Sequence, residues 1–302
     1  MTIATNLTGV ILPALIHPVR TIGGRVFDFS REVAVMAIVN RTPDSFYDRG
    51  ATFALKAAVS AARRATTEGA DWVDIGGTKF APGPAVEISE EIDRVIPVIE
   101  ALSDSGAVIS VDTFHPDVAL ASISAGAHVI NDTTGVHDPA MAEIVGDSNA
   151  TLVITHSLAA PRMAYPAPTY VDVVDEVATF LRERVELAVS RGVPLERIVI
   201  DPGFDLNKNT SHSLELTRRL GEITALGIPT LAAVSNKDFI GETLNRERDA
   251  RVEGSLAAAV FCILQGARIV RMHNVAVAVD AVRMTEAILG FREPAYLRHN
   301  MT

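Results

Sequence analysis

Short runs of apolar, often β-branched residues alternate with longer stretches of helical periodicity along most of the chain. Polar residues follow each short run, which predicts eight strands at residues 33–39, 72–75, 108–111, 128–130, 151–154, 198–200, 230–233 and 269–272. The longer stretches predict eight helices at residues 54–68, 88–103, 116–125, 139–147, 171–191, 214–226, 251–265 and 276–289. Such alternation is typical of βα units that build a parallel sheet.

Eight βα units match a (β/α)8 TIM barrel, which takes roughly 250 residues as one domain. We therefore predict an α/β fold of this type, a single domain over residues 1–302 with the barrel proper at about residues 33–290. A doubly wound open sheet would place a glycine-rich turn after the first strand, but residues 40–43 read Asn-Arg-Thr-Pro. Residues 21–29 surround a Gly-Gly turn and predict an N-terminal β-hairpin that closes the bottom of the barrel.

The composition, with 48% hydrophobic and 21% charged residues, excludes disorder for most of the 302 residues. With 27 Lys and Arg against 37 Asp and Glu, the net charge of −10 argues against nucleic acid or anionic lipid as a partner. No apolar stretch approaches the ~18 residues of a membrane span. The single cysteine, Cys262, excludes an internal disulfide and a thiolate metal cluster. Because the start of the chain also lacks a basic secretory leader, we expect a cytoplasmic protein.

A ring of polar residues follows the predicted strands. In a TIM barrel the chemistry takes place at the C-terminal ends of the strands, because the loops there meet at one mouth. A helix cap or a turn explains a polar residue after one strand, but not after nearly every strand. The residues are Asn40, Gly76, Gly77, Asp112, Asn131, Asp132, Thr155, His156, Asp201, Ser235, Asn236, Lys237, Arg271 and His273.

Four of these side chains suit a flat, nitrogen-rich heterocycle. Asp112, Asn131 and Asp201 offer hydrogen-bond acceptors and donors, and Lys237 adds a fixed donor. A cap, a turn residue or a solvated helix start is the alternative for each of them. The sequence therefore predicts a heterocycle site at the mouth of the barrel.

Two further features suit a phosphate and a cation. Arg271 and His273 leave the same face of the last strand, as suits a phosphate or pyrophosphate, unless they form an ion pair with Asp132 or Asp201. The first loop, at residues 40–46, is either an ordinary turn or a mobile lid. Such a lid would bring an amide oxygen to a divalent cation and a carboxylate to a developing positive charge.

Taken together, these strand ends resemble those of the dihydropteroate synthase family of folate biosynthesis, which belongs to the pterin-binding barrel superfamily. The resemblance runs nearly from end to end, and its motifs are specific in combination. They lie at residues 36–40 (MAIVN), 42–46 (TPDSF), 74–77 (DIGG), 110–113 (SVDT), 129–132 (VIND), 200–203 (IDPG), 235–237 (SNK) and 269–273 (IVRMH).

The resemblance implies a transferase that joins 6-hydroxymethyl-7,8-dihydropterin pyrophosphate to p-aminobenzoate by an SN1-like route. The implied substrate-binding residues are Asp112, Asn131, Asp201, Ser235, Lys237, Arg271 and His273, the last two near the pyrophosphate. The implied catalytic residues are Asp44, Lys237 and Arg271, and Asn40 is the implied ligand of Mg²⁺. The resemblance also implies binding of sulfonamide- or sulfone-type mimics of aminobenzoate. It further implies a homodimer, with the helices at 255–265 and 275–289 as interface candidates unless their apolar faces only pack on the barrel.

The chain departs from the family pattern on one half of the site. The family usually reads G-G-E-S-T-R-P-G where residues 76–83 read G-G-T-K-F-A-P-G, and S-R-K where the chain has Asn236 in the middle position. Asp205 replaces a usual glycine and Leu206 a usual aromatic residue. A hydrogen bond to a charged group contributes roughly 1.5 to 3 kcal/mol. Losing two arginine contacts therefore corresponds to roughly 100-fold to 10,000-fold in rate.

We therefore predict a diverged second copy of dihydropteroate synthase with weak or absent synthase activity, which is not the main folate-pathway enzyme. One alternative is a working synthase in which Arg41 or Lys79 replaces the missing arginine. Another is a non-catalytic protein that binds a pterin-like ligand or regulates a partner synthase. A pterin-dependent methyltransferase is a further alternative, and it would need a separate corrinoid protein.

Overall fold

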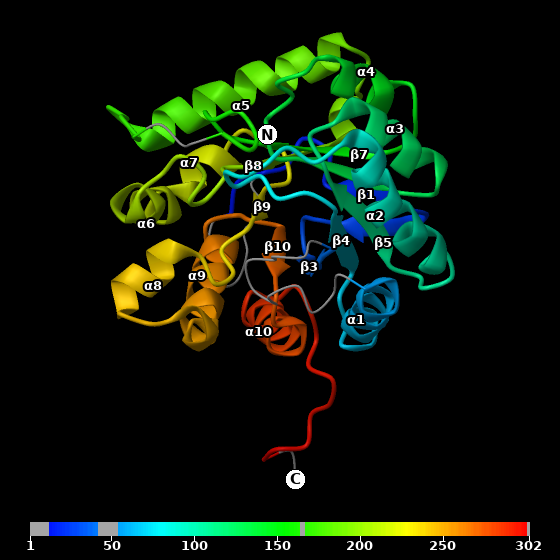
Figure 1. Cartoon of the computed structure of the whole chain (residues 1–302). Coiled ribbons are helices and arrows are strands. Elements are labelled where there is room, and N and C mark those ends of the chain that lie inside the picture. The colour runs from blue at the N-terminus through cyan, green and yellow to red at the C-terminus, as the bar shows by residue number, and fades with distance from the viewer. Residues whose placement is uncertain (1–11, 42–53, 164–166, 301–302) are drawn as a thin grey trace.

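Ten strands form the two sheets of the described structure. The structure, a computed structural model, describes residues 12–41, 54–163 and 167–300. The strands are β1 (Val19–Ile22), β2 (Arg25–Asp28), β3 (Ala34–Asn40), β4 (Trp72–Gly76), β5 (Val108–Asp112), β6 (Val129–Asp132), β7 (Thr151–Thr155), β8 (Ile198–Asp201), β9 (Leu231–Ala232) and β10 (Ile269–Met272). Eight of them are parallel, in the order β8-β7-β6-β5-β4-β3-β10-β9, and a parallel bridge between Ile200 and Thr230 joins the two ends of this sheet (Figure 1). The predicted (β/α)8 barrel is confirmed.

Helices lie around the outside of the barrel (Figure 1). They are α1 (Leu55–Thr67), α2 (Ile88–Ala101), α3 (Pro116–Ser124), α4 (Ala140–Gly146), α5 (Val173–Ser190), α6 (Thr210–Arg218), α7 (Leu220–Thr224), α8 (Asp238–Leu244), α9 (Val252–Leu264) and α10 (Val275–Ile288), with 3-10 turns at Leu195–Arg197 and Arg248–Ala250. In place of one helix over residues 214–226 the chain forms α6 and α7, because Asn209 caps α6 early and Arg219 leaves the helical conformation. The sequence pattern does not predict α8, because seven residues are too few to show a helical period.

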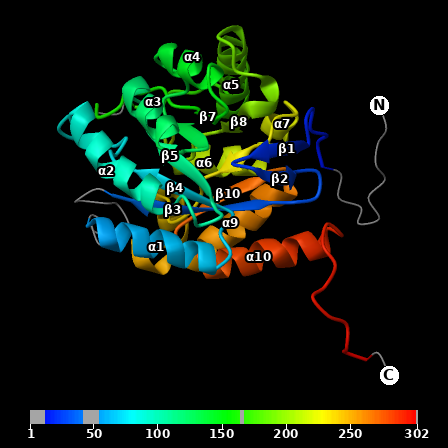
Figure 2. The same ribbon diagram turned by 90° about the vertical axis from the view of Figure 1, so that its right-hand side faces the viewer.

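The predicted hairpin closes the N-terminal end of the barrel (Figure 2). β1 and β2 pair antiparallel around Gly23 and Gly24, whose φ angles of 57° and 75° suit a type I′ turn. Phe27 stacks on Phe29 at 5.6 Å and meets Trp72 edge-on at 6.0 Å. These rings are fully buried among the inward side chains of the strands, so this end of the barrel is filled and the opposite end carries the mouth.

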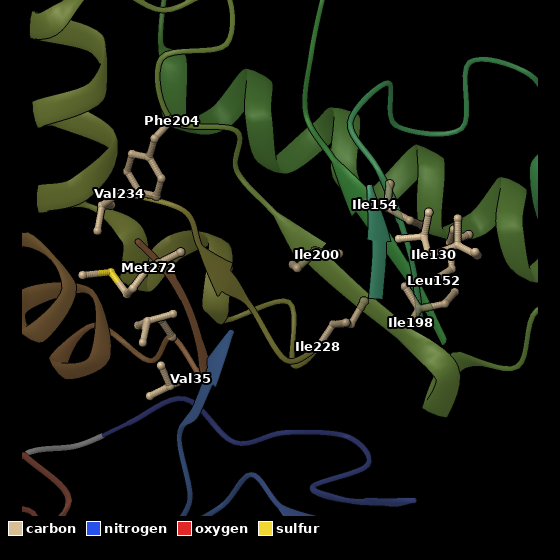
Figure 3. Packing of buried hydrophobic residues seen from close by; sticks show 14 of the residues in the cluster. Val35, Ile130, Leu152, Ile154, Ile198, Ile200, Phe204, Ile228, Val234 and Met272 are labelled. Atoms are coloured by element: carbon tan, nitrogen blue, oxygen red, sulfur yellow. The ribbon is translucent and has the colours of Figure 1, made fainter. Parts of the chain in front are cut away.

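A second, larger core lies between the strands and the helices. Figure 3 shows part of it, where Ile130, Leu152 and Ile154 of neighbouring strands lie together. Cys262 is buried in this layer, and burial raises the pKa of its thiol to about 12. Within the described residues, no helix has both the length and the apolar character that a membrane crossing needs.

Candidate functional site

A cavity of about 400 Å³ lies at the C-terminal ends of the strands. Every predicted site residue that the structure describes lines it. These residues are Asn40, Asp112, Asn131, Asp201, Ser235, Lys237, Arg271 and His273. Asp44 lies outside the described residues, so its position is not part of this geometry.

We divide the cavity by depth along the strands. The inner half is formed by side chains of the strands themselves, Asp112, Asn131, Asp201 and Arg271. The outer half is formed by loop residues beyond the strand ends, at 78–81, Asp205, Leu206 and Asp238. Lys237 directly precedes α8, and because it interacts with both Asp201 and the Phe204 carbonyl we assign it to neither half.

Arg271 organises the inner half by binding two carboxylates. Its Nε donates to Oδ2 of Asp74 at 2.7 Å, and its Nη2 donates to Oδ2 of Asp112 at 3.0 Å. Asp74 is fully buried and also accepts from Oγ of Ser110 at 2.6 Å and from Nδ2 of Asn131 at 3.1 Å. The sequence reasoning missed Asp74 as a site residue, although a carboxylate in a buried apolar strand was the signal for it.

Burial sets the ionisation of the inner carboxyl groups. It raises the pKa of Asp112 to about 7, while Arg271 opposes this shift and Asp74 adds to it. Burial also raises the pKa of Asp201, against the hydrogen bond from the Gly203 amide at 2.7 Å and the nearby charge of Lys237. A carboxyl group that titrates near neutrality accepts or donates a hydrogen bond, as a ligand rich in ring nitrogens requires.

Four further polar atoms in the cavity point to a ligand. Among the described residues, Oδ1 of Asn131 and the hydroxyls of Thr78, Thr133 and Thr155 are buried without a hydrogen-bond partner. All four residues line the cavity. A buried polar atom without a partner is costly, so these atoms are suited to a ligand or to ordered water. His156, which follows Thr155 in the predicted ring, does not line the cavity.

The loop after β8 is held from below by Lys208. Its buried Nζ donates to the carbonyl oxygens of Gly203 at 2.9 Å and Leu206 at 3.0 Å, and contacts Nδ1 of His156 at 2.9 Å. Burial lowers the pKa of Lys208 to about 7, and burial together with the Lys208 charge lowers the pKa of His156 to about 2. His156 is therefore neutral and accepts from Lys208. His156 therefore supports the loop after β8 and does not contribute to the cavity.

The same loop is tied to the start of α8 through Asp205, which adopts a left-handed φ of 62°. Its Oδ2 accepts from the Asp238 amide at 2.6 Å, and its Oδ1 accepts from Oγ of Ser213 at 3.0 Å. Lys237, one residue before Asp238, donates from Nζ to the Phe204 carbonyl at 3.0 Å. These hydrogen bonds hold Lys237 and the loop after β8 together.

Arg162, in the loop after β7, holds the second loop of the barrel in place. Its Nη1 donates to the carbonyls of Ala81 at 2.7 Å and Lys79 at 3.1 Å, and its Nε and Nη2 donate to that of Pro84 at 3.0 and 2.8 Å. An added Cβ at Gly83 would lie 2.3 Å from Nη2 of Arg162, so a side chain there would displace the guanidinium from these carbonyls. Nothing in the sequence pattern pointed to this contact.

The departures from the family pattern acquire a structural meaning. Asn236 is fully buried with a φ of 55°, and its backbone amide donates to Oγ of Ser255 at 2.9 Å. It does not line the cavity. Arg41 donates to the carbonyls of Asp93 at 2.9 Å and Arg94 at 2.6 Å on α2 and does not line the cavity either. Lys79 does line it. Of the two cations proposed to replace the missing arginine, only Lys79 is placed to do so.

The barrel and the carboxylates at its strand ends define a class of protein. The family described as "Pterin binding enzyme" matches residues 36–273, and the chain belongs to this family. Within it, the chain is a homologue of dihydropteroate synthases.

Three relatives illustrate the likeness. "Inactive dihydropteroate synthase 2" of Mycobacterium tuberculosis (strain ATCC 25618 / H37Rv) is 44% identical over 268 residues, 86% of this chain and 84% of the relative. "Dihydropteroate synthase" of Escherichia coli (strain K12) is 40% identical over 261 residues, 86% and 93% of the two chains. The structure of Xanthomonas albilineans dihydropteroate synthase with 4-aminobenzoic acid has a TM-score of 0.83 and 41% identity, covering 90% of this chain and 98% of that one.

Proposed function

We propose that this protein binds a pterin in the inner half of the cavity and is weak or inactive as a dihydropteroate synthase. The observation that carries this proposal is the contrast between the two halves. The inner carboxylates and Asn131 converge with unpartnered polar atoms, while the outer half has no arginine among its described lining residues. The 44% identity to a relative named inactive supports the same conclusion.

In this proposal the inner residues bind and orient the ring. Asp112, Asn131 and Asp201 hydrogen-bond the pterin edge, and Lys237 donates a further hydrogen bond to the pterin. Arg271 acts mainly by holding Asp112 in position, because its guanidinium donates to two carboxylates, those of Asp74 and Asp112. Catalytic roles for Asp44, Lys237 and Arg271 come from the family resemblance and are part of the same proposal.

Ser235 and His273 form the edge of the site nearest the expected pyrophosphate. Oγ of Ser235 lies 3.0 Å from Nδ1 of His273 and accepts from its amide at 3.1 Å. We propose that this pair contacts the pyrophosphate of a phosphorylated pterin.

The Mg²⁺ of the family reaction would arrive together with pyrophosphate. Asn40 lines the cavity and offers one neutral oxygen, and an added Cβ at Gly76 would lie 3.1 Å from that oxygen. Among the described residues, no group of three or more His, Cys, Asp or Glu side chains could hold a metal ion. Because Mg²⁺ usually binds through one or two protein oxygens plus phosphate and water, Asn40 fits this limited role. The ion would neutralise charge on the pyrophosphate.

Particular observations support two alternative functions. Lys79 in the outer half favours a working synthase in which an amine replaces the missing arginine. The intact inner half without a complete outer half favours a non-catalytic pterin-binding or regulatory protein. Sulfonamide- or sulfone-type ligands belong to the first alternative, because they mimic aminobenzoate.

We also propose a cytoplasmic homodimer. The buried, free thiol of Cys262 suits a reducing compartment. The exposed side chains of Phe261 on α9 and of Met284 and Ile288 on α10 support an interface on these helices, with exposed fractions of 42%, 63% and 63%.

The test compares binding with turnover in the same preparation. With 6-hydroxymethyl-dihydropterin pyrophosphate, 4-aminobenzoate and Mg²⁺, we expect turnover at least about 100-fold below that of the E. coli enzyme. Calorimetry should still detect binding of 6-hydroxymethylpterin. The substitution Asp201→Asn should weaken this binding by about 10-fold to 100-fold, because a hydrogen bond to a charged group is lost. The exposed Asp147→Asn serves as the control.

Each alternative has its own outcome. Turnover comparable to that of the E. coli enzyme would contradict the proposal and favour the working synthase. Absence of pterin binding would contradict it altogether. Co-purification with a second synthase chain would favour the regulatory alternative.

A further inference from the structure

The outer half of the cavity carries two carboxylates of its own. Asp205 and Asp238 both line it, and Lys79 is the single cation among the described residues of this half. Phe80 and Leu206 add apolar surface. The outer half is therefore a partly apolar wall with an excess of negative charge.

Asp205 is not paired with a fully charged cation: the cation with which it interacts electrostatically, Lys208, is buried under the loop and has its pKa lowered to about 7. Its carboxylate accepts from the Asp238 amide at 2.6 Å and from the Ser213 hydroxyl at 3.0 Å, and both donors are uncharged. Within the described residues, no ion pair involves Asp205. These hydrogen bonds hold the carboxylate in one place without cancelling its charge.

The charge of Asp238 is only partly offset. Its Oδ1 pairs with Nη1 of Arg251 at 2.8 Å, and the Asp238 side chain is 58% exposed. The same Nη1 also donates to the carbonyls of Asn236 at 3.0 Å and Lys237 at 3.2 Å. Arg251 does not line the cavity, so a ligand in the outer half would meet the carboxylate and not the guanidinium.

Arg271 and Lys237 do not compensate for these charges. Arg271 is bound by Asp74 and Asp112, and Lys237 donates to a carbonyl and faces Asp201. The described lining residues thus include four carboxyl groups against three cations, and the two inner carboxyl groups, whose pKa burial raises, already interact with Arg271 and Lys237. An anion placed beside like charges is disfavoured.

We infer that the outer half recognises a flat partner with an uncharged or cationic polar group, and excludes a carboxylate-bearing one. This inference rests on the proposed function, because it takes the outer half as the place of a second ligand beside the pterin. Asp205 and Asp238 are the residues that determine this specificity. Phe80 and Leu206 supply the surface on which the ring of the partner packs.

The test uses two probes that differ in charge and little in shape, 4-aminobenzoate and 4-aminobenzamide. Binding of both to the full chain is measured by calorimetry, with and without saturating 6-hydroxymethylpterin. We expect the neutral amide to bind at least about tenfold more tightly than the anion. Asp205→Asn and Asp238→Asn should each strengthen benzoate binding several-fold and leave amide binding within about twofold.

The variants are matched to separate charge from fold. An asparagine at either position keeps an oxygen acceptor, so Asp205→Asn still accepts from the Asp238 amide. The exposed Asp147→Asn lowers the net negative charge equally without touching the cavity, and it should change neither probe. Thermal unfolding of each variant reports whether the fold is intact.

Three outcomes would overturn the inference. They are equal or tighter binding of the benzoate, unchanged benzoate binding in both asparagine variants, and no binding of either probe with or without the pterin. A preference for the amide in a protein that does not bind the pterin would instead contradict the proposed function alone. The two failures are therefore distinguishable.

Discussion

The inner and outer halves of the cavity differ in how much the fold depends on them. In the inner half, Asp74 and Asp112 are bound by one buried guanidinium, and Asp74 also accepts from Ser110 and Asn131. In the outer half, Arg162 binds mostly backbone carbonyls of a loop, which are present whatever the side chains are. The side chains at 78–81 can change without removing those bonds. The side chains of the outer half can therefore change without loss of the fold, whereas those of the inner half also stabilise the barrel.

The largest effect expected from this contrast is on stability. Arg271→Met leaves the fully buried Asp74 and the partly exposed Asp112 without their cation, which should lower the free energy of unfolding by about 3–5 kcal/mol. In the outer half, Asp238→Asn breaks a half-exposed pair and should cost less than about 1 kcal/mol. Urea denaturation of both variants checks the difference. Similar losses in the two variants would contradict the contrast.

A smaller effect is expected in the pH dependence of stability. Burial raises the pKa of Asp112 to about 7 in the folded protein, above the value of 3.8 expected when it is unfolded. Between these two pH values the folded state binds more protons than the unfolded state. The contribution of Asp112 to the free energy of unfolding is therefore fully present below pH 3.8 and is lost as the pH rises through 7. Asp112→Asn removes this titrating group. The free energy of unfolding of the variant should therefore increase relative to that of the wild type as the pH rises from about 4 to 8.

The measurement is the difference in unfolding free energy between wild type and Asp112→Asn across this pH range. Taking the difference cancels carboxyl groups that do not act on Asp112, such as Asp201, whose pKa is also raised. A difference that does not vary with pH would show that Asp112 is already ionised in the folded protein.

The smallest effect is expected in the outer half and should be local. Arg162→Ala removes the hydrogen bonds to the carbonyls of Lys79, Ala81 and Pro84. Amide hydrogen exchange over residues 79–84 should become about tenfold faster, which corresponds to about 1.4 kcal/mol of local opening. The urea midpoint should change little, since the barrel strands are not involved.

Arg184→Ala is the control for this last variant, because Arg184 also donates to a loop carbonyl, that of Val136, in another loop. It should leave exchange at residues 79–84 unchanged. Equal exchange rates in wild type and Arg162→Ala would show that the loop is held by other contacts.

The sequence was sufficient for the architecture and for the inner half of the site. The alternation of periods marks the eight strands, and the barrel rule then predicts that polar residues at their ends share one mouth. Asp112, Asn131, Asp201 and Arg271 were found in this way and do line one cavity. Their roles in binding and catalysis stay predictions.

Other features were beyond the pattern of the sequence. The seven-residue α8 leaves no periodic signal, and the break between α6 and α7 depends on a local conformation at Arg219. Asp205 was visible as a departure from the family, but its hydrogen bonds to Asp238 and Ser213 were not. A substitution shows which group has changed, and only its surroundings show what that group does.

The amino-acid sequence by itself determined that this chain is a barrel with a polar mouth, because hydrophobic periodicity is a local property repeated in every βα unit. The tertiary structure alone decided which polar groups are partners. Asp74 and Arg271 are 197 residues apart, and Arg162 is 83 residues from Lys79. Such pairings depend on side-chain directions and distances that exist only once the strands are closed into a barrel, and they are what separates a group held by the fold from one that is available to a ligand.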